Sequence, residues 1–298
     1  GVIFSIFEHL SMNREFRQTL LHKMAEKAGV LTSLVQQKLE PVAPVVSTPK
    51  SNFKELFLQT PAGPAREKLI LEEALKRGAP KNLVPVTVDG PGGLKITYKV
   101  MPDYLMIDGL RITMAPATAQ KVADAFGMKL PTDKMSQQIY QAADAKIRAN
   151  PLSGAGYRDA QGVYHDGTDV VKNRINKSDA AVEYSRQNDQ ELEKLKTNGK
   201  TPTLVAGHGK DILQPMGEAG TPSMGGWAGV DGKPLQPYSS PHKGQAQVHS
   251  EYGLYTRLVG DQATVVFPDG RTVETSLEKL LNDPKTAKML ATKPGVAK

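Results

Sequence analysis

Apolar residues recur three or four positions apart in several parts of this 298-residue chain, which is the period of an amphipathic helix. Between Leu130 and Asn150, Met135, Ile139 and Ala143 share one face, and Pro131 with an acidic residue soon after it is typical of a helix start. We expect that face to lie against the core. The spacing predicts helices over Asn13–Leu39, Ala65–Lys76, Ala115–Met128, Leu130–Asn150 and Ser178–Lys196, and one or two short helices over Ser276–Leu290.

Runs of β-branched residues separated by turn signals predict two β-units. In Val84–Met114, one pair of runs flanks Asp89–Gly93 and a second pair flanks Asp108-Gly109, a dipeptide that favours a tight hairpin. This segment is predicted to form a small antiparallel meander. The remaining predicted strands are a short one over Thr203–Ala206 and a second unit over 254–276, with a turn at Asp269-Gly270.

A long stretch from Leu204 to Arg257 shows little helix or strand pattern and is rich in glycine and proline. It holds three of the six histidines and the only tryptophan, Trp227. Its scattered aromatic and leucine residues favour an ordered loop region over disorder, and long ordered loops are often functional. We expect Thr203–Ala206 to lie near Leu254–Val259, so that the region closes on itself. The fold class is therefore predicted as α+β, with antiparallel β-meanders, flanking helices and a long ordered Gly/Pro-rich loop region.

The domain organisation follows from a proline-rich segment near the N-terminus. Residues 40–51, EPVAPVVSTPKS, carry three prolines and read as a linker or extended strap. Residues 1–45 are predicted to form an N-terminal helical segment with this linker, and 46–298 to form a single α+β domain that carries the site.

Composition narrows the classes of partner. A net charge of +7 and a pI near 9.3 suit an anionic or polymeric partner, but the basic residues are spread out and form no specific nucleic-acid signature. No apolar run is long enough for a transmembrane helix. The absence of cysteine excludes disulfides and thiolate chemistry, and it is compatible with an oxidising bacterial envelope. The opening GVIFSIF reads as a trimmed terminus, and we expect an extracytoplasmic or secreted protein.

The segment AGHGKD places His208, Lys210 and Asp211 directly after a predicted strand. His208 could act as a general base or metal ligand, and Lys210 could stabilise an oxyanion or hold an anionic group. Asp211 could serve beside them, or pair with Lys210, or cap the following turn. A catalytic His208 is expected to be open to solvent and to contribute little to packing. The alternative is a polar loop whose histidine bonds to the backbone.

A second cluster contains His242, His249, Glu251 and Tyr252. Together with His208, the two histidines offer a set of zinc ligands for which Glu251 could be the general base. No His-Glu-x-x-His element supports this, so zinc is considered but not favoured.

A metal-free alternative uses the same region. Tyr252 and a histidine exchange protons, while Arg257 binds an acid or sugar carboxylate. Trp227 stacks on a ring of the substrate, or instead anchors the long loop, and Gln236 is a further substrate-binding candidate. The segment with His165, Asp166 and Asp169 is better explained by a hairpin turn than by calcium binding.

Several of these motifs resemble those of a group of bacterial and fungal proteins whose activity is largely uncharacterised. The resemblance covers about half the chain, from Pro102 onward, and implies a shared architecture without an activity to carry over. HSEYGLYTR stands where that group has a tighter Tyr-Ser-His-Gly-x-Arg segment, so the roles of His249, Tyr252 and Arg257 do not follow from it. The matching positions are Tyr104, Leu130–Met135, Ala206–Asp211, Trp227, Asp231–Pro237 and His242.

Two functions are carried forward. The first is an extracytoplasmic hydrolase or related enzyme acting on a cell-wall or polysaccharide-type polymer through a His/Lys/Asp/Tyr/Arg cluster. The second is a non-catalytic envelope or phage-particle structural or binding protein. The candidate catalytic residues are His208, Lys210, Asp211, His242 and Tyr252, the substrate-binding ones Trp227, Gln236 and Arg257, and the metal ligands His208, His242 and His249.

Overall fold

The computed structural model describes residues 53–150, 152, 157–158, 164–165, 178–214, 223–229, 231–236 and 251–292. These residues belong to one compact unit, Asn52–Lys298. The helix predicted over Asn13–Leu39 and the division at residue 45 lie outside the described residues.

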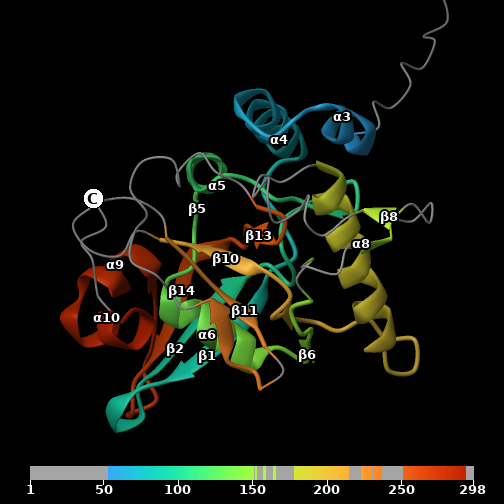
Figure 1. Cartoon of the computed structure of the whole chain (residues 1–298). Helices are drawn as coiled ribbons and strands as arrows, with labels where there is room; N and C mark the ends of the chain where they lie inside the picture. Colours follow the sequence, from blue (N-terminus) through green and yellow to red (C-terminus); the bar gives the residue numbers. More distant parts are fainter. Residues whose placement is uncertain are drawn as a thin grey trace, which may run out of the picture. The chain divides into compact units, whose positions relative to one another are not determined.

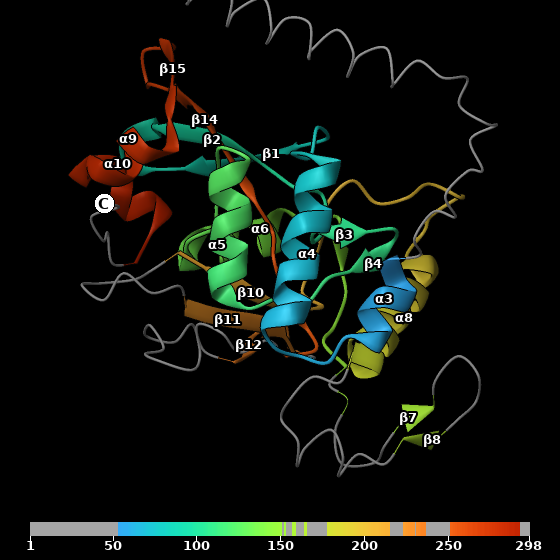
Figure 2. The same cartoon turned by 90° about the horizontal axis from the view of Figure 1, so that it is seen from above.

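Helices appear close to where the hydrophobic spacing predicts them (Figures 1 and 2). A helix over Phe53–Gln59 was not predicted, because it directly follows the proline-rich segment. No helix within the described ranges is long and apolar enough to cross a membrane. The helices are α3 (Phe53–Gln59), α4 (Pro64–Arg77), α5 (Pro116–Ala125), α6 (Asp133–Ala142), α8 (Ser178–Lys194), α9 (Leu277–Asn282) and α10 (Pro284–Leu290).

Helix α6 is shorter than the predicted Leu130–Asn150. Thr132 caps its start, because its Oγ1 accepts a hydrogen bond from the Met135 backbone N–H at 3.1 Å. The helix ends at Ala142, and the next residues form a strand, β6 (Ala145–Lys146), parallel to β9 (Val205–Ala206). The Asp144 carboxylate fixes this change, since it accepts hydrogen bonds from the backbone N–H groups of residues 203 and 204 at 2.8 and 2.7 Å.

The predicted β-units unite in one antiparallel sheet, in the order β1-β2-β14-β15. Its strands are β1 (Val84–Asp89), β2 (Lys95–Val100), β14 (Val259–Val266) and β15 (Thr272–Ser276), with β5 (Met128–Lys129) also paired to β14. Both hairpins, β1–β2 and β14–β15, follow the sequence prediction. The central β2–β14 pairing joins segments that are distant along the chain, and no local turn signal reports it.

The meander predicted over Val84–Met114 is wrong in one respect. Its second hairpin, β3 (Met106–Ile107) and β4 (Leu110–Arg111), forms a separate two-stranded sheet around the expected Asp108-Gly109 turn. The intervening segment leaves the first sheet because its backbone N–H groups at 101 and 105 bond to carbonyls at 258 and 256, at 3.1 and 2.7 Å.

Among the described residues, the Gly/Pro-rich region forms a four-stranded sheet, in which three strands stand where a loop was predicted and β13 falls within the β-unit predicted over 254–276. The sheet has the order β12-β11-β10-β13. Strand β11 could not be predicted from the hydrophobic pattern, because glycines occupy positions where a strand usually has alternating apolar residues. The strands of this sheet are β10 (Lys210–Leu213), β11 (Ser223–Ala228), β12 (Pro234–Gln236) and β13 (Leu254–Tyr255).

The predicted closure of this region is confirmed. Strands β10 and β13 pair in parallel, and Nη2 of Arg257 donates a hydrogen bond to the Val205 carbonyl at 2.5 Å. Tyr184 contacts both Tyr252 and His208, because its ring centre lies 5.3 Å from that of Tyr252 and its hydroxyl donates to the His208 carbonyl.

Among the described residues, the two largest of four apolar clusters hold the sheets and helices together. One includes side chains of α4 and α5 with Ile212 and Met224 of the second sheet. The other includes the first sheet, α6, α9 and α10. Helix α6 contacts strands of both sheets and therefore sits where they meet.

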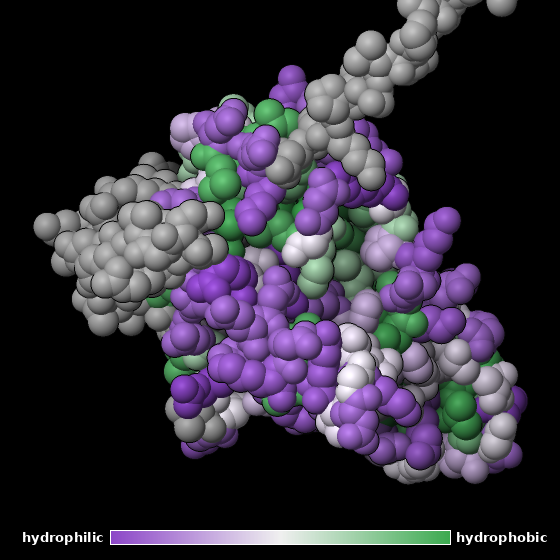
Figure 3. All heavy atoms as spheres, turned by 90° about the vertical axis from the view of Figure 1, so that its right-hand side faces the viewer, coloured by the Kyte–Doolittle hydropathy of each residue, from purple (hydrophilic) through white to green (hydrophobic). Residues whose placement is uncertain are grey.

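Viewed from the side of α8, the surface is mainly hydrophilic (Figure 3). A short antiparallel hairpin pairs β7 (Tyr157–Arg158) with β8 (Tyr164–His165), and the turn predicted at Asp166-Gly167 lies outside the described residues.

Candidate functional site

A cavity of about 320 Å³ opens where α6 meets the second sheet. One wall comes from α6, another from the segment after β9 and from β11, and the mouth from the start of β12. Its size suits a small ligand or one unit of a polymer. The polar and aromatic residues that line it include Tyr104, Ser136, Tyr140, Asp211, Trp227, Lys233 and Arg257.

Glycines form part of the cavity wall because no larger residue fits there. Gly207 has φ +100°, and a Cβ at this position would lie 2.5 Å from the Ile147 carbonyl oxygen. A Cβ on Gly209 would lie 2.4 Å from Cδ2 of Tyr255. The Gly-His-Gly sequence thus reflects close packing of the chain beside the cavity.

Asp211 is the one acidic residue among the described residues that line the cavity, and its carboxylate is held on both sides. The Tyr104 hydroxyl donates to Oδ1 at 2.6 Å, and the Ser136 hydroxyl donates to Oδ2. Burial, then the charge of Asp211, raise the pKa of Tyr104 well above its usual range, so this donor stays protonated. Asp211 is 7% exposed, and its ordered oxygens retain further acceptor capacity toward a ligand.

Trp227 lines the cavity in a strained backbone conformation, with φ +65°. Its indole Nε1 donates to the Tyr184 hydroxyl at 2.7 Å, and Nζ of Lys210 lies 4.7 Å from the ring centre. Lys210 forms an ion pair with Glu251, which replaces the predicted pairing with Asp211, and its predicted role toward an anionic group stays a prediction. Positive φ in a bulky residue persists only where the surroundings enforce it, and such strain clusters at binding sites.

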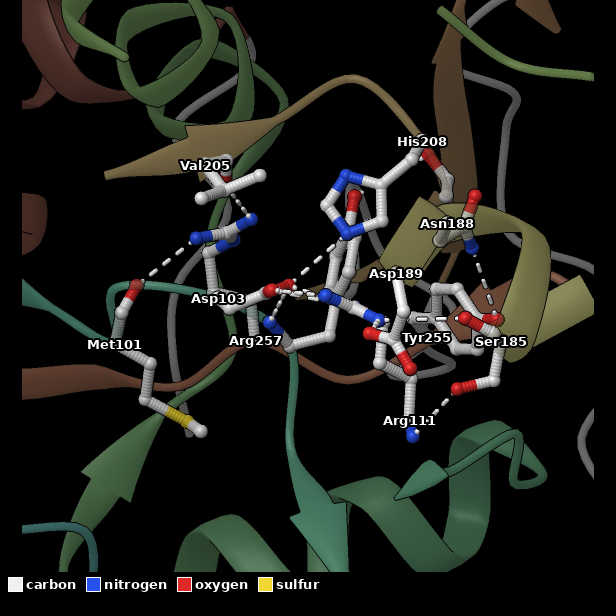
Figure 4. A network of polar contacts seen from close by, with 12 residues as sticks. Met101, Asp103, Arg111, Ser185, Asn188, Asp189, Val205, His208, Tyr255 and Arg257 are labelled. Carbon is white, nitrogen blue, oxygen red and sulfur yellow. Dashed lines mark hydrogen bonds and ion pairs between the residues drawn. The ribbon is translucent and has the colours of Figure 1, made fainter. Parts of the chain in front are cut away.

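His208 is fully buried, which corrects the expectation of a solvent-exposed base. Its ring does not line the cavity, and its Nε2 lies 2.9 Å from Oδ1 of Asp103. Figure 4 shows Asp103 between His208 and Arg111, whose Nη2 donates to Oδ2 of Asp103 at 2.7 Å. Arg111 also pairs with Asp189 and so connects this network to α8.

The charges in this network favour one protonation state. Burial would raise the pKa of Asp103, but His208 and Arg111 hold it well below its usual range. Burial lowers the pKa of His208 more than Asp103 raises it, so the ring is neutral at pH 7. A neutral ring that donates from Nε2 leaves Nδ1 as an acceptor, and Nδ1 has no partner among the described residues.

Arg257 is 1% exposed and is one of the residues that line the cavity. Its Nη1 donates to the Met101 carbonyl at 2.9 Å, its Nη2 bonds to Val205, and its guanidinium carbon lies 4.5 Å from the centre of the Tyr104 ring. The predicted substrate-binding residue thus does face a cavity, although it also ties two chain segments together.

The other predicted site residues have different positions. The Tyr252 hydroxyl donates to the Leu152 carbonyl at 3.1 Å, and burial, then Glu251, raise its pKa to about 12, which disfavours proton exchange near neutral pH. Gln236 is the last residue of β12, paired with Gly226. His242 and His249 lie outside the described residues. Within the described ranges, no three potential ligands cluster as a metal site.

The sequence interpretation missed several residues of the site and its support. Ser136, Tyr140 and Lys233 line the cavity, and Asp103, Arg111 and Tyr184 hold the residues behind it. The only sequence signal for Ser136 was its position next to Met135, which belongs to the predicted apolar face of α6. Asp103 and Arg111 lie only eight residues apart and bond to each other, but their other partners, His208 and Asp189, are distant in sequence, so no local pattern marked the network.

Comparisons with protein-family models, with curated proteins and with solved structures found no match to this chain.

Proposed function

We propose that the protein binds one ring of a polysaccharide or cell-wall polymer in the cavity between α6 and the second sheet. The observation that carries this proposal is Trp227, which lines the cavity with φ +65° and is held by Tyr184 and Lys210. A rigid aromatic face suits stacking on a ring, and a nearby carboxylate, Asp211, suits hydrogen bonds to its hydroxyl groups.

The polymer class also agrees with the composition of the chain. A cysteine-free sequence of net charge +7 suits work on anionic material in a cell envelope. An extracytoplasmic location is part of this proposal.

Hydrolysis of the bound polymer is a second candidate function, and the placement of Asp211 favours it. His208 is buried away from the cavity, so Asp211 replaces it as the group that accepts a proton from an attacking water. The water oxygen bonds to the anomeric carbon, the bond from that carbon to the leaving sugar oxygen breaks, and this oxygen takes up a proton from solvent. Tyr104 and Ser136 would hold the carboxylate in position during that step.

Calorimetric titration with cell-wall disaccharides and short neutral and acidic oligosaccharides tests the binding proposal. We expect binding by the wild type and about a tenfold loss of affinity for neutral sugars in Asp211→Asn, because the amide removes one acceptor for their hydroxyl groups. Asp124→Asn, at an exposed position of α5, is the control and should bind normally. Absence of binding to every sugar by the folded wild type would overturn the proposal.

Product analysis on the same sugars separates the two functions. If hydrolysis occurs, Asp211→Asn should lower its rate at least about a hundredfold. Binding without products would leave the non-catalytic function as the correct one.

A further inference from the structure

We propose that the cavity selects a sugar ring carrying a carboxylate, with Arg257 in the inner wall and Lys233 at the mouth as the cations that recognise it. This inference rests on the proposed function and specifies its ligand class. Acidic sugars with a ring carboxylate or a carboxylate-bearing ether substituent fit this description.

The first observation is the charge of Arg257. This residue is buried and lines the cavity, yet in the described part of the chain the contacts of its guanidinium are two carbonyl oxygens and the face of Tyr104. No carboxylate there forms an ion pair with it. Arg111, which is equally buried, has two carboxylate partners, Asp103 and Asp189. A buried cation without a counter-ion is costly, so an anion entering beside Arg257 would be stabilised.

The second observation is the balance of charge around the cavity. Asp211 is the single acid among its described lining residues, and its two oxygens already accept hydrogen bonds from Tyr104 and Ser136. Lys233 adds a second positive charge at the mouth. The lining therefore carries more positive than negative charge, in a chain that is itself basic.

The third observation is the freedom of the Lys233 side chain. It is 83% exposed, and its ammonium lies 3.8 Å from the Asp231 carboxylate in a loose pair. Such a pair contributes little by itself, so Lys233 can turn toward an incoming anion at small cost. Arg257, whose guanidinium is already held by two carbonyls, supplies the fixed part of the recognition.

The test compares acidic sugars with their methyl esters, which keep the ring and remove the charge. Suitable pairs are hexuronic acid disaccharides and a disaccharide containing N-acetylmuramic acid, each titrated into the full chain at low and at raised salt. We expect the acids to bind at least about tenfold more tightly than the esters at low salt, and the difference to shrink as salt rises.

Lys233→Ala should weaken acid binding about three- to fivefold and weaken ester binding less than that, so that the acid preference falls. The matched control is Lys68→Ala on α4, because Lys68 is 76% exposed and also lies 3.8 Å from a carboxylate, that of Glu72. Arg257→Lys should lose more affinity for the acids than for the esters, with thermal melts to confirm that it folds.

The outcomes separate the two proposals. Equal binding of acids and esters by the wild type would overturn the charge selection and leave sugar binding in place. Binding of neither would overturn both. An unchanged acid preference in Lys233→Ala would remove Lys233 from the recognition.

Discussion

Nε2 of His208 lies 2.9 Å from Oδ1 of Asp103, and the histidine has no exposed surface. Asp103 in turn bonds to Arg111, which reaches α8 through Asp189. The residue with the strongest catalytic appearance in the sequence is therefore part of a buried network that joins separate segments of the fold.

Replacing His208 with alanine should destabilise the protein by about 2–4 kcal/mol, because the change removes a buried ring and its hydrogen bond to a charged group. Urea unfolding of wild type and variant measures the difference. A loss below about 0.5 kcal/mol would mean that the network does not support the fold.

Protonation of His208 should lower stability in mildly acidic solution. Burial depresses its pKa in the folded state below the ordinary value of 6.5, so the unfolded chain takes up the proton first. The stability that this residue contributes is complete above about pH 6.5 and falls as the pH drops from there toward the lower folded pKa. Unfolding free energies between pH 5 and 8 should show this slope, at most about 1.4 kcal/mol per pH unit. The slope should shrink in His208→Gln, and an unchanged slope would assign it to other groups.

Gly207→Ala should destabilise the fold by about 2–4 kcal/mol. The new Cβ would lie 2.5 Å from the Ile147 carbonyl oxygen, and Ile147 cannot easily move away because its backbone N–H donates to the Ala206 carbonyl. Gly207 also has φ +100°, which strains any residue with a side chain. Gly109→Ala is the control, because its φ is +78° but no atom lies within 4 Å of the added carbon. It should cost only about 1 kcal/mol. Equal melting temperatures for the two variants would contradict the close packing beside the cavity.

Tyr184→Phe should reduce the free energy of ligand binding by more than it reduces the free energy of unfolding. The Tyr184 hydroxyl accepts from Nε1 of Trp227 and donates to the His208 carbonyl at 2.6 Å, so it fixes the indole in its strained position. Its loss should cost about 1–2 kcal/mol of stability and increase the mobility of the indole. Fluorescence anisotropy of Trp227 measures that mobility, and an unchanged anisotropy would show that other contacts hold the ring.

The parts of the fold that the sequence predicted are those with local signals. The hairpins at Asp108-Gly109 and Asp269-Gly270 and the start of α6 follow from turn and capping residues. The pairing of β2 with β14 was not predicted, because it depends on contacts between segments that are distant in the sequence. Strand β11 was also missed, since its glycines and half-buried Trp227 show no alternating pattern.

The sequence predicted the region of the candidate site correctly, but it did not predict the role of each residue there. Asp211, Trp227 and Arg257 do line one cavity, as their shared region suggested. The role of His208 could not be judged from sequence, because exposure is decided by its packing against Tyr104 and Tyr255. Ser136 carries no motif, and Lys233 occupies a variable position of the Asp231–Pro237 segment, so both are recognised only from their positions around the cavity.

Trp227 is the only tryptophan in the chain, so its fluorescence reports directly on the proposed ring-binding cavity. The decisive measurement is a titration of the wild type with cell-wall and polysaccharide fragments, followed by the emission of Trp227 and its quenching by acrylamide. Saturable change in emission, together with protection of the indole from the quencher, is the predicted result. A fragment that binds by calorimetry but leaves both signals unchanged would place the ligand elsewhere and contradict the proposed function.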